Sequence, residues 1–264
     1  MDVLLTRPDA DHRHADEKEL SEMKNQFVSM VSHELRTPLA SIKAYVEMLI
    51  DGEAVDAGTQ REFYEVIQNE ANRLGRLIDN ILNISRIESG LARINRKPHE
   101  LGGILREAVG VIAPHATQKR ITIEHRVEPE QYPIVADRDM LYQAVLNLLS
   151  NAVKYTPEGG SIALQTSADP ERGNVLIRII DTGVGIPPKD LPFIFDKFYR
   201  AEANKRIAPG TGLGLSLVRH IVETVHGGRV SVESHVGCGS CFVIELALDR
   251  TCHAQDRALL AAAG

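Results

Sequence analysis

The chain of 264 residues has a formal net charge of −6 and a pI of about 5.9, so it has no general attraction for nucleic acid. Its hydrophobic fraction of 43% is enough for one large domain or two modest ones. No apolar run reaches the roughly 18 residues that cross a membrane, no signal-peptide pattern begins the chain, and three cysteines fit a reducing compartment. We therefore expect a cytoplasmic protein with no membrane segment.

The first 15 residues are polar and are expected to form a disordered tail or linker. Residues 16–50 predict a long amphipathic helix, because apolar residues recur every three or four positions. These residues form one stripe, made of Leu20, Met23, Phe27, Val31, Leu35, Pro38, Ile42, Tyr45 and Leu49. Proline inside a helix removes a backbone hydrogen bond and crowds the preceding turn, so we expect a bend just after His33.

His33 stands off this stripe. At about 100° per residue it lies about 200° from both Val31 and Leu35, which places its imidazole away from the packed face. A histidine held there, with the carboxylate of Glu34 directly after it, is free to react with a group that docks from solvent. Spacing alone does not separate this interpretation from an ordinary surface histidine.

A turn is expected over residues 51–58, followed by a second helix over 59–89. Its apolar stripe consists of Phe63, Ile67, Ala71, Leu74, Ile78 and Ile81. Two long helices joined by a short turn form an antiparallel hairpin, which leaves apolar surface that a second copy covers in a four-helix bundle. We therefore predict a homodimer through this region, with packing against the rest of the same chain as the alternative.

After Lys97 and Pro98 the pattern changes from long helices to a mixture of short elements. Helices are predicted over 101–113, 139–155 and 212–226, and strands over 121–123, 134–136, 161–166, 175–181, 230–233 and 241–248. This mixture predicts an α/β sandwich with one sheet covered by helices, so the whole chain belongs to the α+β class. The expected domains are a tail over 1–15, a helical domain over 16–97, the sandwich over 98–248 and a disordered tail over 249–264.

The helix predicted over 139–155 presents polar residues on one face. They lie at positions i, i+4, i+7 and i+8, and are Asn147, Asn151, Lys154 and Tyr155. A solvated face is the plain alternative, but asparagine is a poor helix former, so two on one face indicate another use. An amide oxygen suits Mg²⁺, which prefers hard oxygen ligands, and the lysine is placed to neutralise phosphate charge.

Asp181 ends a predicted strand and is followed by a turn containing Gly183, Gly185 and Ile186. A carboxylate there accepts a hydrogen bond from the exocyclic amine of adenine. Guanine presents a carbonyl instead, and the unsatisfied buried contact would cost about 1–3 kcal/mol. The turn therefore predicts an adenine-binding pocket.

A second glycine-rich turn leads into the helix predicted over 212–226. Such a turn lets backbone amides reach phosphates, and its residues are Gly210, Thr211, Gly212, Leu213, Gly214 and Leu215. The aromatic residues of 193–200 are expected to anchor a mobile lid before this turn, on which Lys205 and Arg206 meet either phosphate or solvent. Cys238 and Cys241 form an isolated CxxC pair, for which chance placement is favoured over a metal or redox site.

These motifs together resemble the catalytic core of the sensor histidine kinases, over about residues 18–248. Residues 31–39 resemble the phosphoacceptor box and 147–157 the N box, while 181–186 and 210–215 resemble the two glycine boxes. Residues 195–200, which end in Arg200, resemble the F box. Ser240 stands where the family commonly has threonine, and we expect little functional cost because serine keeps the hydroxyl.

The resemblance implies a dimeric four-helix bundle followed by an ATP-binding sandwich of the GHKL type. It implies a histidine kinase in which Asp181 reads the adenine of ATP and Asn151, with Asn147, holds Mg²⁺. A neutral nitrogen of His33 attacks the γ-phosphoryl group, while Glu34 hydrogen-bonds the other ring nitrogen and accepts its proton.

The resemblance further implies transfer of the phosphoryl group to an aspartate on the receiver domain of a separate response regulator. Thr37 lies one turn after His33 on the same face, and resembles the family's element that positions water to dephosphorylate the regulator. We therefore expect a phosphatase activity as well. The alternatives are an ATP-binding dimeric scaffold and a clamp ATPase without phosphotransfer, although the clamp leaves residues 31–39 unexplained.

Overall fold

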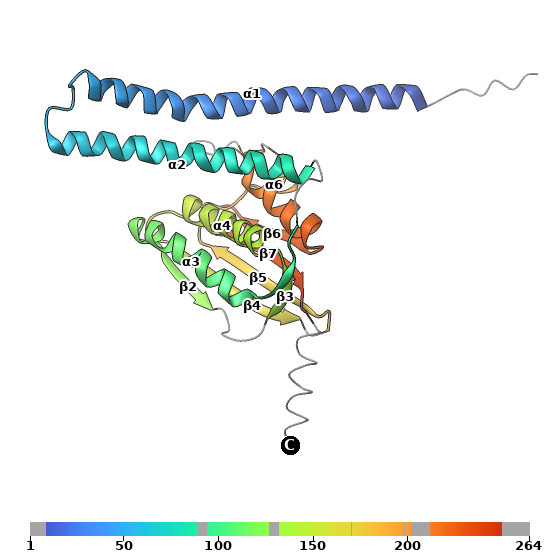
Figure 1. Ribbon diagram of the computed structural model, residues 1–264. Helices are drawn as coiled ribbons and strands as arrows, with labels where there is room; N and C mark the ends of the chain where they lie inside the picture. The colour runs from blue at the N-terminus through green and yellow to red at the C-terminus, as the bar shows by residue number, and fades with distance from the viewer. Residues whose placement is uncertain are drawn as a thin grey trace, which may run out of the picture. The chain divides into compact units, whose positions relative to one another are not determined.

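The computed structural model describes residues 9–88, 94–126, 132–169, 171–197, 199–201 and 212–249 (Figure 1). The chain divides into two compact units, one ending at Leu82 and the other beginning at Asn83. The first unit is helical, and the second combines helices with a mixed sheet. This arrangement confirms the α+β class.

The first unit is an antiparallel hairpin of two long helices, α1 (Asp9–Ile50) and α2 (Ala57–Glu88) (Figure 1). The helix α1 begins earlier than the expected residue 16. It continues through Pro38 as one helix. The rings of Tyr45 and Phe63 pack edge to face between the helices, with centroids 5.1 Å apart.

Asp56 begins α2. Its carboxylate accepts hydrogen bonds from the backbone N–H of Gly58 at 2.8 Å and of Thr59 at 2.9 Å, and from the Thr59 hydroxyl at 2.7 Å. These bonds satisfy amides that have no partner inside the helix, and the bonds from Thr59 lower the pKa of the Asp56 carboxyl. The helix therefore begins slightly before the expected residue 59.

The apolar surface of the hairpin is only partly covered within one chain. The side chains of Leu20, Met23 and Phe27 lie outside the described part of the predicted stripes. Most of the other stripe residues are half-buried or buried, and Leu77 of α2 is buried although it lay outside the predicted stripe. A second apolar set remains exposed, made of Leu39, Val46, Ile50, Tyr64, Ile78 and Leu82. Ala71 is also exposed. The hairpin thus presents apolar side chains on a face that its own two helices leave uncovered.

The second unit contains a five-stranded sheet in the order β2-β4-β5-β7-β6. Its strands are β2 (Thr122–Arg126), β4 (Ser161–Asp169), β5 (Asn174–Asp181), β6 (Arg229–His235) and β7 (Gly239–Ala247). Only β2 and β4 pair in parallel, and the other neighbours are antiparallel. Alternate residues of β4, β5 and β7 are buried beneath helices, as in Ile162, Ile177 and Ile244. This arrangement confirms the predicted α/β sandwich.

The helices over this sheet are α3 (Leu101–Gln118), α4 (Arg138–Tyr155) and α6 (Gly214–Arg219) (Figure 1). A short 3₁₀ helix, η1 (Leu191–Phe193), lies between β5 and α6. The residues after α6 wind more widely, as the π-helix η2 (His220–Val225), instead of completing the single helix predicted over 212–226.

A small second sheet was not predicted. Strand β1 (Lys97–Glu100) pairs antiparallel with β3 (Pro133–Ala136). In the sequence, Lys97 and Pro98 mark only the change from long helices to short elements, and proline cannot donate a ladder hydrogen bond. Proline is tolerated in an edge strand such as this one.

His226 fixes the beginning of α4. Its Nε2 accepts a hydrogen bond from the Asp137 N–H at 3.0 Å, while Nδ1 lies 2.7 Å from the carbonyl oxygen of Ile221. Burial lowers the pKa of the His226 ring, so the neutral ring with its proton on Nδ1 fits both partners. The Asp137 carboxylate caps α4 through the Met140 N–H at 3.2 Å.

Candidate functional site

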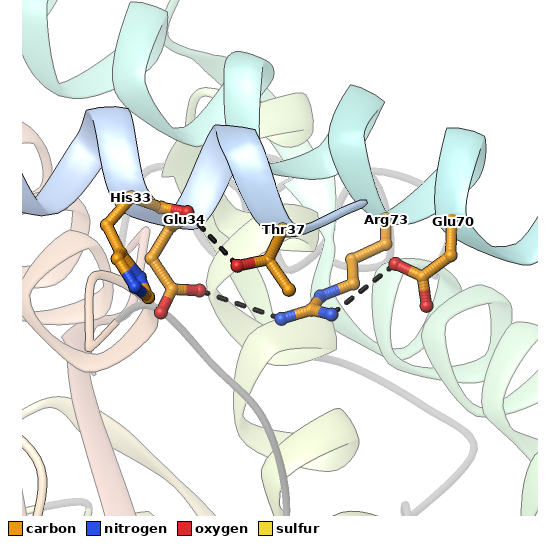
Figure 2. Close-up of polar contacts among 5 residues, drawn as sticks. All are labelled: His33, Glu34, Thr37, Glu70 and Arg73. Carbon is orange, nitrogen blue, oxygen red and sulfur yellow. Dashed lines mark hydrogen bonds and ion pairs between the residues drawn. The ribbon is translucent and has the colours of Figure 1, made fainter. Parts of the chain in front are cut away.

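His33 lies on α1 with its side chain exposed, as its distance from the apolar stripe predicted (Figure 2). The hydroxyl of Thr37, one turn later, donates a hydrogen bond to the His33 carbonyl oxygen at 3.2 Å. This bond ties the threonine hydroxyl to the helix backbone beside the histidine. Both side chains are therefore open to a group that approaches from solvent.

Glu34 makes an ion pair that the sequence analysis did not predict. Its carboxylate lies 3.6 Å from a guanidinium nitrogen of Arg73 on α2, and Arg73 also lies 3.4 Å from the carboxylate of Glu70 (Figure 2). Among the described residues, no hydrogen bond joins Glu34 to the His33 ring. Consecutive residues of a helix do not face each other, which explains why the two side chains make no hydrogen bond. The expected role of Glu34 as proton acceptor remains a prediction.

The polar face of α4 is present as predicted. Asn151, Lys154 and Tyr155 are half-buried, and the Lys154 ammonium lies 4.9 Å from the centre of the Tyr155 ring. Burial raises the pKa of the Tyr155 hydroxyl, while the nearby charge of Arg200 lowers it. The face thus combines two amides and a cation in a partly dry environment.

Asn147 has a buried polar group that a ligand could satisfy. Its amide nitrogen is buried and has no hydrogen-bond partner among the described residues. A Cβ added at Gly214 would lie 3.5 Å from the Asn147 side-chain oxygen, so this amide faces the beginning of α6. Buried polar groups in native proteins are nearly always satisfied, and a polar ligand with oxygen atoms would satisfy this one.

Asp181 ends β5 with its side chain buried. One carboxylate oxygen accepts a hydrogen bond from the Gly183 N–H at 2.8 Å. Burial raises the pKa of this carboxyl, and hydrogen bonds from the backbone of Gly183 and Ser240 oppose that rise. A buried carboxylate that has remaining acceptor capacity, and no ion pair with any cation of the described residues, suits a neutral donor such as an amine of a base.

The glycines after Asp181 allow close backbone approach. A Cβ at Gly183 would lie 2.8 Å from the Tyr155 carbonyl oxygen, and one at Gly185 would collide with the His235 carbonyl. Gly185 also has φ of +73°, a conformation that glycine adopts readily. The Val184 N–H donates to the Tyr155 carbonyl at 3.2 Å. The loop therefore lies directly against the end of α4.

The loop is also fastened to β6, whose Ser234 contacts Ser240 of β7. The buried Ile186 donates its N–H to the Ser234 hydroxyl at 2.8 Å, and the hydroxyls of Ser234 and Ser240 lie 2.9 Å apart. Ser240, which replaces the commoner threonine, thus supplies a buried hydroxyl to this network. Sequence reasoning did not predict Ser234, because a serine within a strand carries no signal of its own.

The second glycine turn is only partly described. Gly212 has φ of +71°, Leu213 is buried, and Gly214 and Leu215 are half-buried at the beginning of α6. Gly210, Thr211 and the lid cations Lys205 and Arg206 lie outside the described residues. Arg200 is half-buried, and its neighbour Tyr199 donates a hydrogen bond to the buried carboxylate of Asp190 at 2.6 Å. This bond anchors the segment that precedes residues 202–211, where the sequence predicts the lid.

The described residues also bear on a metal site at the cysteine pair and on a membrane-spanning helix. Cys238 and Cys241 are free thiols, and no group of three or more histidine, cysteine or acidic residues is placed to hold a metal in the part of the chain that the structure describes. Within the same residues, no helix combines the length and apolarity needed to cross a membrane.

Family models match both units. The His Kinase A (phospho-acceptor) domain matches residues 23–90, and the histidine kinase-, DNA gyrase B- and HSP90-like ATPase matches residues 136–250. The chain is 35% identical over 241 residues to drug sensory protein A of Synechocystis sp., covering 88% of this chain and 36% of that protein. It is 32% identical to sensor protein SrrB of Staphylococcus aureus, covering 92% of this chain and 41% of that protein.

The chain therefore spans about two fifths or less of the length of these curated relatives. Its fold is similar to that of the histidine kinase ThkA in complex with the response regulator protein TrrA, with a TM-score of 0.67 at 23% identity, covering 94% of this chain and 68% of that one. The two family matches lie in the same order as the two structural units and together cover more than half of the chain. The chain thus belongs to the sensor histidine kinase family and comprises its phosphoacceptor domain followed by its ATPase domain.

Proposed function

We propose that this chain is the catalytic core of an ATP-dependent protein histidine kinase, which phosphorylates His33 and passes the phosphoryl group to an aspartate of a response regulator. The observation that carries the proposal is the occurrence, in one chain, of an exposed histidine in a phosphoacceptor domain and a buried carboxylate beside glycines in an ATPase domain. The relatives named as sensor proteins support the same activity.

In the proposed reaction, a ring nitrogen of His33 with a free lone pair attacks the γ-phosphorus of ATP. A nitrogen–phosphorus bond forms while the bond from phosphorus to the leaving oxygen of ADP breaks, and Glu34 accepts the ring proton. The exposure of His33 supports this role, because the attack requires in-line access to the phosphoryl group.

ATP fits the second unit through residues on α4 and the two glycine turns. Asp181 accepts a hydrogen bond from the adenine amine, while Gly183, Gly185 and Ile186 form the wall beside it. A second set of residues surrounds the phosphates and their counter-ions. It consists of Asn147, Asn151, Lys154, Tyr155, Arg200, Gly210, Thr211, Gly212, Leu213, Gly214 and Leu215. The amide oxygens of Asn151 and Asn147 suit Mg²⁺, which when bound neutralises phosphate charge.

The decisive experiment incubates the chain with γ-labelled ATP and tests the stability of the protein-bound label. Phosphohistidine is labile in acid and stable in base, and the proposal requires label with this behaviour. A clamp ATPase releases phosphate without labelling the protein, and an ATP-binding scaffold does neither. Either result would contradict the proposal.

A response regulator is the proposed partner. ThkA, whose fold this chain shares, has been solved in complex with the response regulator protein TrrA. We place the acceptor aspartate on the receiver domain of that regulator. We place the reaction in the cytoplasm, where ATP is available and free thiols such as Cys238 and Cys241 persist.

The chain is also proposed to act as a homodimer through the hairpin. The exposed apolar set, which includes Val46 and Ile78, supplies the surface that a second hairpin would cover. Replacing both with Glu should convert a dimer into a monomer in sedimentation velocity, because burying each side chain contributes about 1.5–3 kcal/mol. Glutamate at Asn69 and Asn72, which are polar, exposed and on the side of α2 away from Ile78, provides the control and should leave the dimer intact. A monomeric wild-type chain would contradict this proposal.

Thr37 carries a proposed phosphatase function, in which its hydroxyl orients a water toward the phosphoaspartate of the regulator. The hydroxyl is exposed and donates to the His33 carbonyl within its own helix, so it is accessible to a docked partner. Thr37→Ala should lower the dephosphorylation rate about tenfold or more, the effect of losing one positioned group. Autophosphorylation at His33 should be retained. Dephosphorylation at the wild-type rate would remove this function from Thr37.

A further inference from the structure

The carboxyl end of α4 is completed by groups from elsewhere in the fold. The last carbonyls of a helix have no partner within the helix. The Ala152 carbonyl accepts from the N–H of Thr156 at 3.0 Å and from its hydroxyl at 2.7 Å. The Tyr155 carbonyl accepts from the Val184 N–H of the glycine loop at 3.2 Å. The remaining carbonyls of this turn need another donor.

Lys119 supplies that donor. Its ammonium donates to the carbonyl oxygens of Val153 at 2.8 Å, Lys154 at 3.1 Å and Thr156 at 2.7 Å, so all three of its N–H groups are used. A cation at this position also faces the negative end of the helix dipole. The backbone of Lys119 is itself held, because its N–H donates to the carbonyl oxygens of His115 and Ala116 at the end of α3.

The turn that Lys119 holds connects two parts of the nucleotide site. It carries Lys154 and Tyr155 on the polar face of α4, and its Tyr155 carbonyl is the acceptor that fastens the Val184 N–H. If the carbonyls on both sides of Tyr155 lose their donor, the turn can fray and release the glycine loop. The position of that loop relative to α4 therefore depends on the ammonium of a residue that lies outside every nucleotide-binding motif.

We infer that Lys119 is a positioning residue for nucleotide binding, which holds the last turn of α4 against the loop that follows Asp181. This inference rests on the proposed binding of ATP to the second unit. Lys119 acts through backbone carbonyls rather than by contact with ATP. Its loss therefore weakens ATP binding and leaves the phosphoacceptor chemistry at His33 intact.

The test compares Lys119→Met with Lys119→Arg. Methionine keeps an unbranched apolar stem and has no donor, so the KM for ATP in autophosphorylation should rise about tenfold, the effect of losing charged hydrogen bonds. The kcat at saturating ATP should stay within about twofold of wild type, because the reacting groups are unchanged. Arginine retains several donors and should recover most of the ATP affinity.

Arg120→Met is the matched control. Arg120 is the adjacent cation, but its guanidinium pairs at 2.9 Å with Glu158 on the surface, where both side chains are exposed. Its removal should leave KM unchanged. Hydrogen exchange adds a local readout, since the Val184 amide should exchange faster in Lys119→Met and at the wild-type rate in Arg120→Met.

The possible results separate this inference from the proposed function. A purely structural role would lower the melting temperature and the active fraction without changing KM or selectively exposing the Val184 amide, and that outcome would overturn the inference. If Lys119→Met does not fold, Lys119→Gln, which keeps one donor group, must show the raised KM or the inference fails. A wild-type chain that binds no ATP in the same titration would instead overturn the proposed function.

Discussion

The His33→Gln variant should incorporate no phosphate from ATP while binding ATP with wild-type affinity. Glutamine keeps a polar side chain on the exposed face of α1 but lacks a nucleophilic ring nitrogen, so the loss of labelling should be complete. The fold should be unaffected, since the His33 side chain is exposed and the hydrogen bond from Thr37 is accepted by the His33 backbone carbonyl. The measurement is protein-bound label after incubation with γ-labelled ATP, together with a nucleotide-binding titration.

His115→Gln is the matched control for this variant. His115 is also exposed on a helix, α3, and lies in none of the motifs. Its replacement should leave labelling unchanged. Label that persists on His33→Gln would show that the phosphoacceptor is a different residue, whereas loss of label from both variants would indicate a general effect of the substitution.

Asp181→Asn should weaken ATP binding by about 10- to 100-fold, the effect of removing a charged hydrogen-bond acceptor from a buried site. The amide keeps the size of the carboxylate and leaves one oxygen for the Gly183 N–H. The amide nitrogen of the new asparagine is a donor, and it would face the adenine amine, which is also a donor. The same nitrogen could donate a hydrogen bond to the carbonyl of guanine. The variant should therefore lose preference for ATP over GTP, which competition between the two nucleotides measures.

The Asp181 carboxyl should give the wild-type chain a pH dependence of ATP binding that the variant lacks. Burial raises the pKa of the Asp181 carboxyl above its ordinary value, so this carboxyl gains a proton at a higher pH than an exposed aspartate does. Protonation removes acceptor capacity, and wild-type ATP affinity should fall as the pH decreases through this raised pKa. Asp181→Asn has no proton to gain there and should show a flatter profile.

Asp139→Asn provides the control for Asp181→Asn. Asp139 is exposed at the beginning of α4, where its carboxylate lies 3.5 Å from Arg138. Its replacement should leave both affinity and nucleotide preference unchanged. Normal ATP binding by Asp181→Asn would contradict the assigned adenine pocket.

The sequence predicted those features that depend on local pattern. The exposure of His33 follows from helical spacing, and the placement of Asp181 at the end of a buried strand follows from the apolar run before it. Asn147 and Asn151 fall on one face of α4 because helical periodicity places them there. Each of these inferences needed only neighbouring residues, and the structure bears out each of these placements.

Features that depend on the pairing of distant segments were not predicted. The ion pair of Arg73 with Glu34 requires the register between two helices, which the pattern of either helix alone does not determine. Strand β1 contains Pro98 and is stabilised by pairing with β3, far along the chain. The role of Lys119 depends on reaching carbonyls of another helix, and a lysine after a helix is ordinary in sequence. All three features depend on tertiary contacts between segments that are distant in the sequence.

The account depends most directly on the site of phosphorylation. The measurement is mass spectrometry of peptides from the wild-type chain after incubation with ATP and Mg²⁺, with digestion at neutral to alkaline pH to preserve phosphohistidine. We expect a single phosphoryl group on the peptide containing His33, attached to the imidazole ring. Phosphate attached to any other residue, or an unmodified His33 in a chain that has bound ATP and Mg²⁺, would contradict the account.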